Sequence, residues 1–246
     1  MQKSGNTILI TGGGSGIGAA LAHEFHAAGN QVIIAGRRQA ALDAVVAEYP
    51  GMAALTVDME NPEAIAAFAG NVVSDFPALN VVIHNAGIMT VENRIDLAVA
   101  EATIATNLLG PIRLTHALLP HLLAQPVATL MTVTSGLAFV PLAATPTYSA
   151  TKAALHSWSL SMREQLKGTS VEVIELAPPG VQTDLVPGHA ENPQMMPLDA
   201  YIAEVIGLLG QEPALEEICV ERVKFLRDAE RRGEFAQVFG ILNAGH

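Results

Sequence analysis

The sequence has a single cysteine among its 246 residues, and charged residues make up only 15% of it. Because Cys219 has no partner within the chain, it cannot form an intrachain disulfide. The first residues, MQKSGNTILITGGG, contain no apolar run long enough for a secretion signal. These two absences predict a cytoplasmic location.

Basic residues are also scarce, with 13 Lys and Arg against 24 Asp and Glu and a formal net charge of -11. Nucleic acids and anionic membranes would repel such a chain. The stretch from Leu114 to Thr151 lacks charge, but several prolines interrupt it, which is atypical of a membrane span. We therefore expect neither nucleic acid nor membrane as a partner, and a small-molecule substrate instead.

Metal-ligand spacing is missing as well. His23 and His26 are three apart and His116 and His121 are five apart, so neither pair has the i,i+4 spacing of a zinc-binding helix. We expect no metal.

Apolar residues, in contrast, make up half of the chain and are arranged in short runs that alternate with helical stretches. Strands rich in Val, Ile and Leu without clean polar alternation indicate a parallel sheet covered on both faces. We expect one α/β Rossmann domain over residues 1–246, with a doubly wound seven-stranded parallel sheet and helices on both faces. The predicted strands are 7–11, 31–36, 53–57, 79–84, 128–134, 171–176 and 216–220, and the predicted helices are 16–28, 39–48, one from about 61, a long region through 123, 148–166 and 198–209.

Two later segments depart from this alternation. Residues 177–199 are rich in Pro and Gly and are predicted to form a mobile loop over the pocket, with the substrate loop at 184–200. Residues 222–243 are predicted to be helical. Met195, Met196 and Leu198 of the loop could contact an apolar substrate, or could instead pack the loop onto the body of the protein.

A glycine-rich turn follows the first strand. In TGGGSGIG the spacing T-G-x-x-x-G-x-G is met by Thr11, Gly12, Gly16 and Gly18, while Ile17 breaks the stricter G-x-G-x-x-G pattern. Such a turn lets the backbone approach a pyrophosphate at the N-terminus of the next helix. The alternative is a tight turn that needs glycine for steric reasons alone.

Tyr148 and Lys152 lie four residues apart in PTYSATKAAL, so they share one face of a helix. Reduction of a carbonyl leaves an alkoxide that needs a proton donor, and a lysine ammonium should lower the pKa of a nearby tyrosine. The alternative is a half-buried ring beside a solvated ammonium. Ser135 ends a strand thirteen positions earlier, and its hydroxyl could donate to a substrate oxygen, with Thr134 as the competing hydroxyl.

Together, the turn, Asn85-Ala86-Gly87 and Y-x-x-x-K closely resemble the short-chain dehydrogenase/reductase family over nearly the whole chain. APPG and RVKFLRDAE are similar to its DltE-like branch, although Pro179 stands where the family usually has glycine. The resemblance implies the catalytic set Asn107, Ser135, Tyr148 and Lys152. It also implies a proton relay from solvent through Lys152 and a cofactor ribose to Tyr148, anchored where Asn107 lies in a locally distorted helix. Helix-interior asparagine is otherwise usually a propensity penalty on a polar face.

The family positions also imply a set of cofactor contacts. Asp58 would accept from the adenine, although it could instead cap the helix near Asn61, and Asn85 could equally have a structural role. The implied cofactor-binding residues are Gly12, Ser15, Gly16, Ile17, Gly18, Arg37, Arg38, Asp58, Met59, Asn85, Ala86, Gly87, Tyr148, Lys152, Val181 and Thr183.

The end of the second strand bears on the choice of cofactor. Gly36 stands where an NAD-selective relative carries an acid, and Arg37 and Arg38 could pair with a 2′-phosphate. We favour NADP over the alternative, NAD. Both arginines could instead be solvated charges at a helix start.

The expected function is therefore hydride transfer between a nicotinamide cofactor and a carbonyl or secondary alcohol, with Tyr148 as general acid/base. The alternative is a non-catalytic dinucleotide-binding sensor on the same fold. By family analogy we expect a homodimer or homotetramer through helices around 100–124 and 148–167, with His156 and Trp158 as packing or subunit-contact residues.

Overall fold

The seven apolar runs each form a strand, and all seven strands lie in one parallel sheet. The computed structural model describes residues 1–92, 94, 96–211 and 213–244. The strand order β3-β2-β1-β4-β5-β6-β7 reverses direction between β1 and β4. In such sheets ligands bind at the carboxyl ends of the strands near this reversal. The strands are β1 (Thr7–Thr11), β2 (Gln31–Gly36), β3 (Ala53–Thr56), β4 (Leu79–His84), β5 (Ala128–Val133), β6 (Val171–Leu176) and β7 (Glu217–Ile218).

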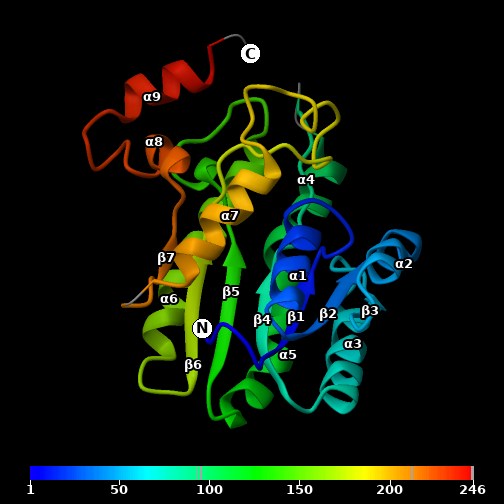
Figure 1. Cartoon of the computed structure of the whole chain (residues 1–246). Coiled ribbons are helices and arrows are strands. Elements are labelled where there is room, and N and C mark those ends of the chain that lie inside the picture. The colour runs from blue at the N-terminus through cyan, green and yellow to red at the C-terminus, as the bar shows by residue number, and fades with distance from the viewer. Residues whose placement is uncertain (93, 95, 212, 245–246) are drawn as a thin grey trace.

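Helices cover both faces of this sheet (Figure 1). Side chains from α1, α2 and α7 pack on one face, and side chains from α3, α5 and α6 pack on the other. The helices are α1 (Gly16–Ala27), α2 (Gln39–Glu48), α3 (Pro62–Asp75), α4 (Leu97–Ile104), α5 (Gly110–Ala124), α6 (Pro146–Gln165), α7 (Leu198–Leu209), α8 (Lys224–Arg227) and α9 (Phe235–Leu242).

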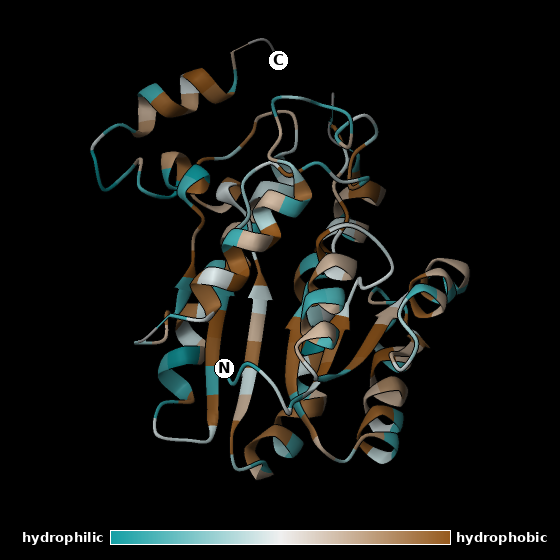
Figure 2. Ribbon diagram, viewed as in Figure 1, coloured by the Kyte–Doolittle hydropathy of each residue, from teal (hydrophilic) through white to brown (hydrophobic). Residues whose placement is uncertain are grey.

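The strands supply apolar side chains to both faces, and β2 and β4 are accordingly largely brown in Figure 2. In β1, Ile8 and Ile10 point to the α1 side and Leu9 to the α3 side, all with no exposed surface. Burial of each such side chain stabilises the fold by roughly 1.5–3 kcal/mol. The expected doubly wound parallel sheet is confirmed.

Some predicted boundaries were wrong. The strand predicted at 216–220 is only Glu217–Ile218, and the helical region before residue 124 contains a π-helix at Ala105–Leu109 between α4 and α5. The segment 222–243 is helical in two pieces, because α8 ends at Arg227 and the turns that follow, which include Gly233 at a left-handed φ of 73°, precede α9.

The C-terminal segment lies beyond the carboxyl ends of the strands (Figure 1). Val140 packs there with Ala229 and Val238 in a small separate core. Asn243 accepts a hydrogen bond from the amide of Ala143 at 2.6 Å and donates one to the carbonyl of Pro141 at 3.2 Å. The loop between Ser135 and Tyr148 is thereby held by residues about a hundred positions away. Within the described part of the chain, no helix is both long and apolar enough to cross a membrane.

Candidate active site

The predicted site residues gather at one edge of the sheet because parallel strands all end there. Gly12 follows β1, Arg37 follows β2, Asp58 follows β3, Asn85 follows β4 and Ser135 follows β5. Helix α6 brings Tyr148 and Lys152 to the same edge, where the Lys152 ammonium donates to the carbonyl oxygen of Val133 at 2.7 Å.

Close packing requires glycine in the turn after β1. A Cβ on Gly12 (φ 68°) would lie 2.8 Å from the Cα of Ala86, and one on Gly18 would lie 2.3 Å from the carbonyl oxygen of Gly12. Gly16 (φ 54°) faces Thr183, whose Cγ2 would be 3.3 Å from such a Cβ. Steric demands therefore account for Gly12 and Gly18, whereas Gly16 lies against a predicted cofactor residue.

The N-terminus of α1 is suited to an anion. Ser15 is exposed at the N-cap position, and its hydroxyl caps none of the described N–H groups. The first turn of α1, which includes Ile17, contains no acidic residue. The free N–H groups and the positive end of the helix dipole can therefore stabilise a phosphate here.

Asn85 joins β4 to the glycine turn. Its amide donates to the carbonyls of Thr11 and Gly12 at 3.0 and 3.2 Å, and the Thr11 hydroxyl accepts from the amides of Asn85 and Ala86. These contacts give Asn85 the structural role that the sequence left open.

Gly87 marks the meeting point of three elements. A Cβ at this position would lie 3.4 Å from Oδ1 of Asn107 and 3.7 Å from Nζ of Lys152. The loop after β4, the π-helix and α6 therefore approach one another at Gly87.

The hydrogen bonds around Asp58 exclude the alternative that Asp58 caps α3. Asn61, not Asp58, caps α3 by accepting from the amide of Ala64 at 2.9 Å. Asp58 accepts from the amide of Glu60 at 3.0 Å in a local turn. The Met59 side chain is buried in the core, so a cofactor contact at Met59 would use its backbone.

Arg37 has a partner that the sequence did not indicate. Its guanidinium lies 3.1 Å from a carboxylate oxygen of Glu60, which also accepts from the hydroxyl of Thr106 at 3.2 Å. Arg37 is therefore a solvent-exposed charge, with its side chain 52% exposed, that also has a carboxylate partner. Arg38 is exposed at the N-cap position of α2.

The two hydroxyls at the end of β5 have different neighbours. Thr134 donates to the Glu175 carboxylate at 2.6 Å and is buried. The Ser135 hydroxyl accepts from the amide of Leu137 at 3.1 Å and lies near Tyr148, where it lowers the pKa of the phenol. Ser135, and not Thr134, is thus the hydroxyl beside the tyrosine.

Tyr148 and Lys152 are 7% and 4% exposed, so the alternative of a solvated ammonium is wrong. The ammonium lies 5.6 Å from the centroid of the phenol ring. Burial raises the pKa of Tyr148 to about 12, against the smaller effect of Ser135, and burial lowers the pKa of Lys152 to about 8. The expected lowering of the tyrosine pKa by lysine is not observed, because desolvation dominates at both groups.

Asn107 lies in the π-helix and is fully buried, so it does not sit on a polar helix face. Its side chain accepts from the amide of Ile88 at 2.8 Å, donates to the Ile88 carbonyl at 2.9 Å, and contacts Thr151. The helix distortion that the family resemblance implied is present.

The 177–199 segment is held to the body of the protein. Val181 pairs with Met196, whose amide donates to the Gly180 carbonyl at 2.8 Å, and both Met196 and Leu198 pack against the main core. Of the two interpretations of these side chains, substrate contact or packing of the loop, packing is the one that describes Met196 and Leu198. The carbonyl of Pro178, in the double proline, accepts from the amide of Gly136 at 2.8 Å.

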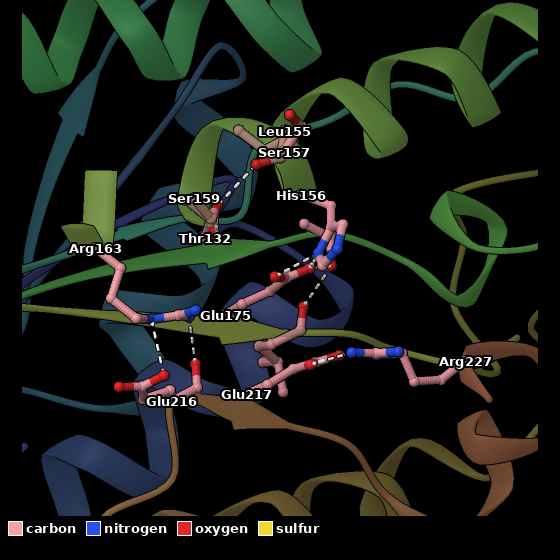
Figure 3. A network of polar contacts seen from close by, with 12 residues as sticks. Thr132, Leu155, His156, Ser157, Ser159, Arg163, Glu175, Glu216, Glu217 and Arg227 are labelled. Carbon is pink, nitrogen blue, oxygen red and sulfur yellow. Dashed lines mark hydrogen bonds and ion pairs between the residues drawn. The ribbon is translucent and has the colours of Figure 1, made fainter. Parts of the chain in front are cut away.

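A buried acid beside the site was missed. Glu175 on β6 contacts Thr134 and His156, as Figure 3 shows for the histidine. The only signal was a glutamate within the apolar run VEVIEL. Trp158 packs against the core, and the His156 ring packs edge-on against Phe139 while its Nδ1 contacts Glu175.

The described ranges contain no group of three or more His, Cys, Asp or Glu side chains placed to hold a metal ion.

Comparisons with known proteins agree with this geometry. The chain is 40% identical over 252 residues to a Bacillus subtilis (strain 168) protein named uncharacterized oxidoreductase DltE. The match covers 99% of this chain and 98% of that one, which confirms the predicted resemblance to the DltE-like branch. It is 32% identical to the sulfoacetaldehyde reductase of Chromohalobacter salexigens, over 72% of this chain and 73% of the reductase.

Solved structures give the same result. A short-chain dehydrogenase from Streptomyces avermitilis is 25% identical with a TM-score of 0.83, covering 95% of each chain. A metagenomic short-chain oxidoreductase in complex with NADP is 29% identical with a TM-score of 0.74, covering 88% of this chain and 96% of that one. The short chain dehydrogenase family profile matches residues 6–194, and this protein therefore belongs to the short-chain dehydrogenase family.

Proposed function

We propose that this protein is an NADP-dependent oxidoreductase that interconverts a carbonyl and a secondary alcohol, with Tyr148 as general acid/base. The observation that carries the proposal is the buried group of Tyr148, Lys152 and Ser135 beside the glycine turn. Two relatives support it by name, the sulfoacetaldehyde reductase and the oxidoreductase in complex with NADP.

The residues at the sheet edge fit a dinucleotide. The uncapped N-terminus of α1 and the cradle between Gly16 and Thr183 suit the pyrophosphate. Arg37 and Arg38 would bind the 2′-phosphate, which favours NADP over NAD. The remaining proposed contacts are Gly12, Ser15, Ile17, Gly18, Asp58, Met59, Asn85, Ala86, Gly87, Tyr148, Lys152 and Val181. When bound, the nicotinamide would supply or accept the hydride.

Ser135 and Tyr148 act on the substrate oxygen in this proposal. The Ser135 hydroxyl donates a hydrogen bond that orients the carbonyl and stabilises developing negative charge. Tyr148, whose pKa is raised to about 12, keeps its proton at neutral pH and donates it to the alkoxide. The environment of the phenol therefore favours its protonated form, which is the form that carbonyl reduction uses.

Lys152 assists the opposite direction. With a pKa of about 8 it is mostly protonated at pH 7, and its charge favours the phenolate that alcohol oxidation needs. Asn107 is proposed to anchor the proton relay to Lys152, since its side chain fixes the loop at Ile88 next to Gly87.

The remaining expectations from the sequence stay predictions. These are the substrate loop at 184–200, a homodimer or homotetramer, and the cytoplasmic location. Of the apolar side chains in the loop, Met195 lies closest to Gly180, where its sulfur would be 2.4 Å from a Cβ.

The test is Tyr148→Phe, which removes only the phenol oxygen. We expect the rate of NADPH oxidation with a panel of aldehydes, ketones and keto esters to fall by about 10²- to 10⁴-fold. Tyr49→Phe is the matched control, because Tyr49 is half-buried and its hydroxyl donates to Glu48 rather than to any site residue. Unchanged turnover in Tyr148→Phe would contradict the mechanism, and NADPH binding without turnover of any panel member would favour a sensor.

A further inference from the structure

Glu175 places a carboxyl group inside the protein, where it has no exposed surface. Among the residues that the structure describes, Lys152 and Glu175 are the only Lys, Arg, Asp or Glu side chains that are fully buried. Burying a carboxylate costs several kcal/mol unless hydrogen bonds and opposite charge compensate it. The burial of Lys152 is explained by its proposed role beside Tyr148. The burial of Glu175 still requires an explanation.

The Glu175 carboxylate joins two elements through hydrogen bonds. Thr134, after β5, donates to it at 2.6 Å, and Nδ1 of His156, on α6, lies 2.9 and 2.8 Å from its two oxygens (Figure 3). A carboxylate only accepts hydrogen bonds, so an ionised Glu175 would receive this one from Nδ1 of His156.

Both partners are next to proposed catalytic residues. Thr134 directly precedes Ser135, and His156 lies one helical turn beyond Lys152 and two turns beyond Tyr148 on α6. The carboxylate therefore connects the backbone that carries Ser135 to the helix that carries Tyr148.

Glu217 and Arg227 extend the polar contacts around this group. Glu217 pairs with Glu175 across β6 and β7, and Arg227 forms an ion pair with Glu217. The Arg227 guanidinium also lies 4.6 Å from the ring centroid of Phe139, which packs edge-on against His156. The C-terminal segment thus closes the cluster on its outer side.

We propose that Glu175 is a positioning residue for the reaction, which holds Ser135 at its working distance from Tyr148 through Thr134 and His156. The inference rests on the proposed function of Ser135 and Tyr148. Glu175 acts through its two partners and makes no contact with reacting atoms.

If Glu175 had a purely structural role, loss of a similar Thr–Glu hydrogen bond elsewhere in the sheet should reduce activity equally. The chain contains such a second hydrogen bond. Thr129 on β5 donates to Glu172 on β6 at 2.8 Å, and Thr129 and Thr134 are each 1% exposed. This second pair joins the same two strands away from Ser135 and provides a matched control.

The first test compares Thr134→Val with Thr129→Val, since each removes one buried hydroxyl. We expect Thr134→Val to lower kcat by about tenfold or more with little change in the KM for NADPH, because a misplacement of about 1 Å can cost 10²-fold. Thr129→Val should change kcat less than about twofold. Equal losses of kcat in both variants would overturn the proposal.

A rescue series tests the acceptor itself. Glu175→Leu removes it, whereas Glu175→Gln keeps one oxygen for Thr134 and offers an amide to His156 in its other tautomer. We expect Glu175→Gln to lie within about threefold of the unmodified kcat and Glu175→Leu at or below a tenth of it. Equal kcat values for folded Glu175→Gln and Glu175→Leu would contradict the proposal. If Glu175→Leu does not fold, the comparison of Thr134→Val with Thr129→Val decides whether the proposal holds.

Crystal structures of the unmodified protein and Thr134→Val provide a readout that needs no turnover, the distance from Ser135 Oγ to Tyr148 Oη. A changed distance in a protein that turns over no carbonyl would leave the positioning intact and refute the proposed function. An unchanged distance would overturn the positioning, whatever happens to kcat.

Discussion

At the scale of single residues, the site combines a tyrosine and a lysine whose pKa values burial moves in opposite directions. The pKa of Tyr148 rises to about 12 and that of Lys152 falls to about 8, so both shifts favour the neutral form. A reductase needs a phenol that stays protonated until charge develops on the substrate. Perturbed groups of this kind are typical of functional sites.

Arg37 provides a test of cofactor choice. We expect Arg37→Asp to weaken NADPH binding by about tenfold or more and NADH binding much less, because only NADPH carries the 2′-phosphate. Cofactor fluorescence titration measures both dissociation constants. Arg232→Asp, at a remote arginine paired with Glu234, is the matched control. Equal losses for the two cofactors, or tighter binding of NADH by the unmodified protein, would refute the argument.

At the scale of elements, the C-terminal segment determines the shape of the loop between Ser135 and Tyr148. A Cβ on Gly136 would meet Leu226 and Val223 at 2.9 Å, so this segment sits directly on the start of the loop. Asn243 holds the other part of the loop at Pro141 and Ala143. The loop beside Ser135 and Tyr148 is therefore shaped partly by residues from the end of the chain.

Asn243→Ala tests this contact. Loss of the acceptor for the Ala143 amide should increase hydrogen exchange at 141–145, because a local opening then costs less free energy. Hydrogen exchange followed by mass spectrometry measures the effect. The same substitution at Asn61, the N-cap of the distant α3, should leave the exchange of 141–145 unchanged. Equal exchange in the unmodified protein and Asn243→Ala would show that the loop holds its shape without Asn243.

At the scale of the whole molecule, the buried Lys152 should make stability depend on pH. Its folded pKa of about 8 lies below the unfolded value of about 10.4. Between these values the unfolded chain binds more protons, so the free energy of unfolding rises with pH. Below about pH 8 the buried ammonium costs the fold about 3 kcal/mol, and this cost is gone above about pH 10.

Lys152→Met removes that charge. We expect the variant to unfold at higher urea concentration than the unmodified protein at pH 7, with the difference shrinking towards pH 10, although the Val133 carbonyl loses its donor. The variant should also lose turnover. Lys167→Met, at an exposed lysine, should show neither effect. A difference that is constant from pH 7 to pH 10 would exclude the buried charge as its cause.

The sequence by itself determined the sheet, because an unbroken apolar run such as TILIT can only be buried on both faces. It also predicted which strand ends and which helix carry Ser135, Tyr148 and Lys152, since local spacing sets those positions. Helix 222–243 and the length of β7 were predicted less well, because Gly233 and long-range packing decide them.

Only the tertiary structure decided which groups are buried together. The carboxylate of Glu175, the choice between Ser135 and Thr134, and the ion pair of Arg37 with Glu60 depend on contacts between residues far apart in the chain. So does the reversal of the expected tyrosine pKa, which follows from desolvation that local spacing does not reveal. Spacing along the chain fixes which residues share an element, but burial and partner distance are set by how the elements pack.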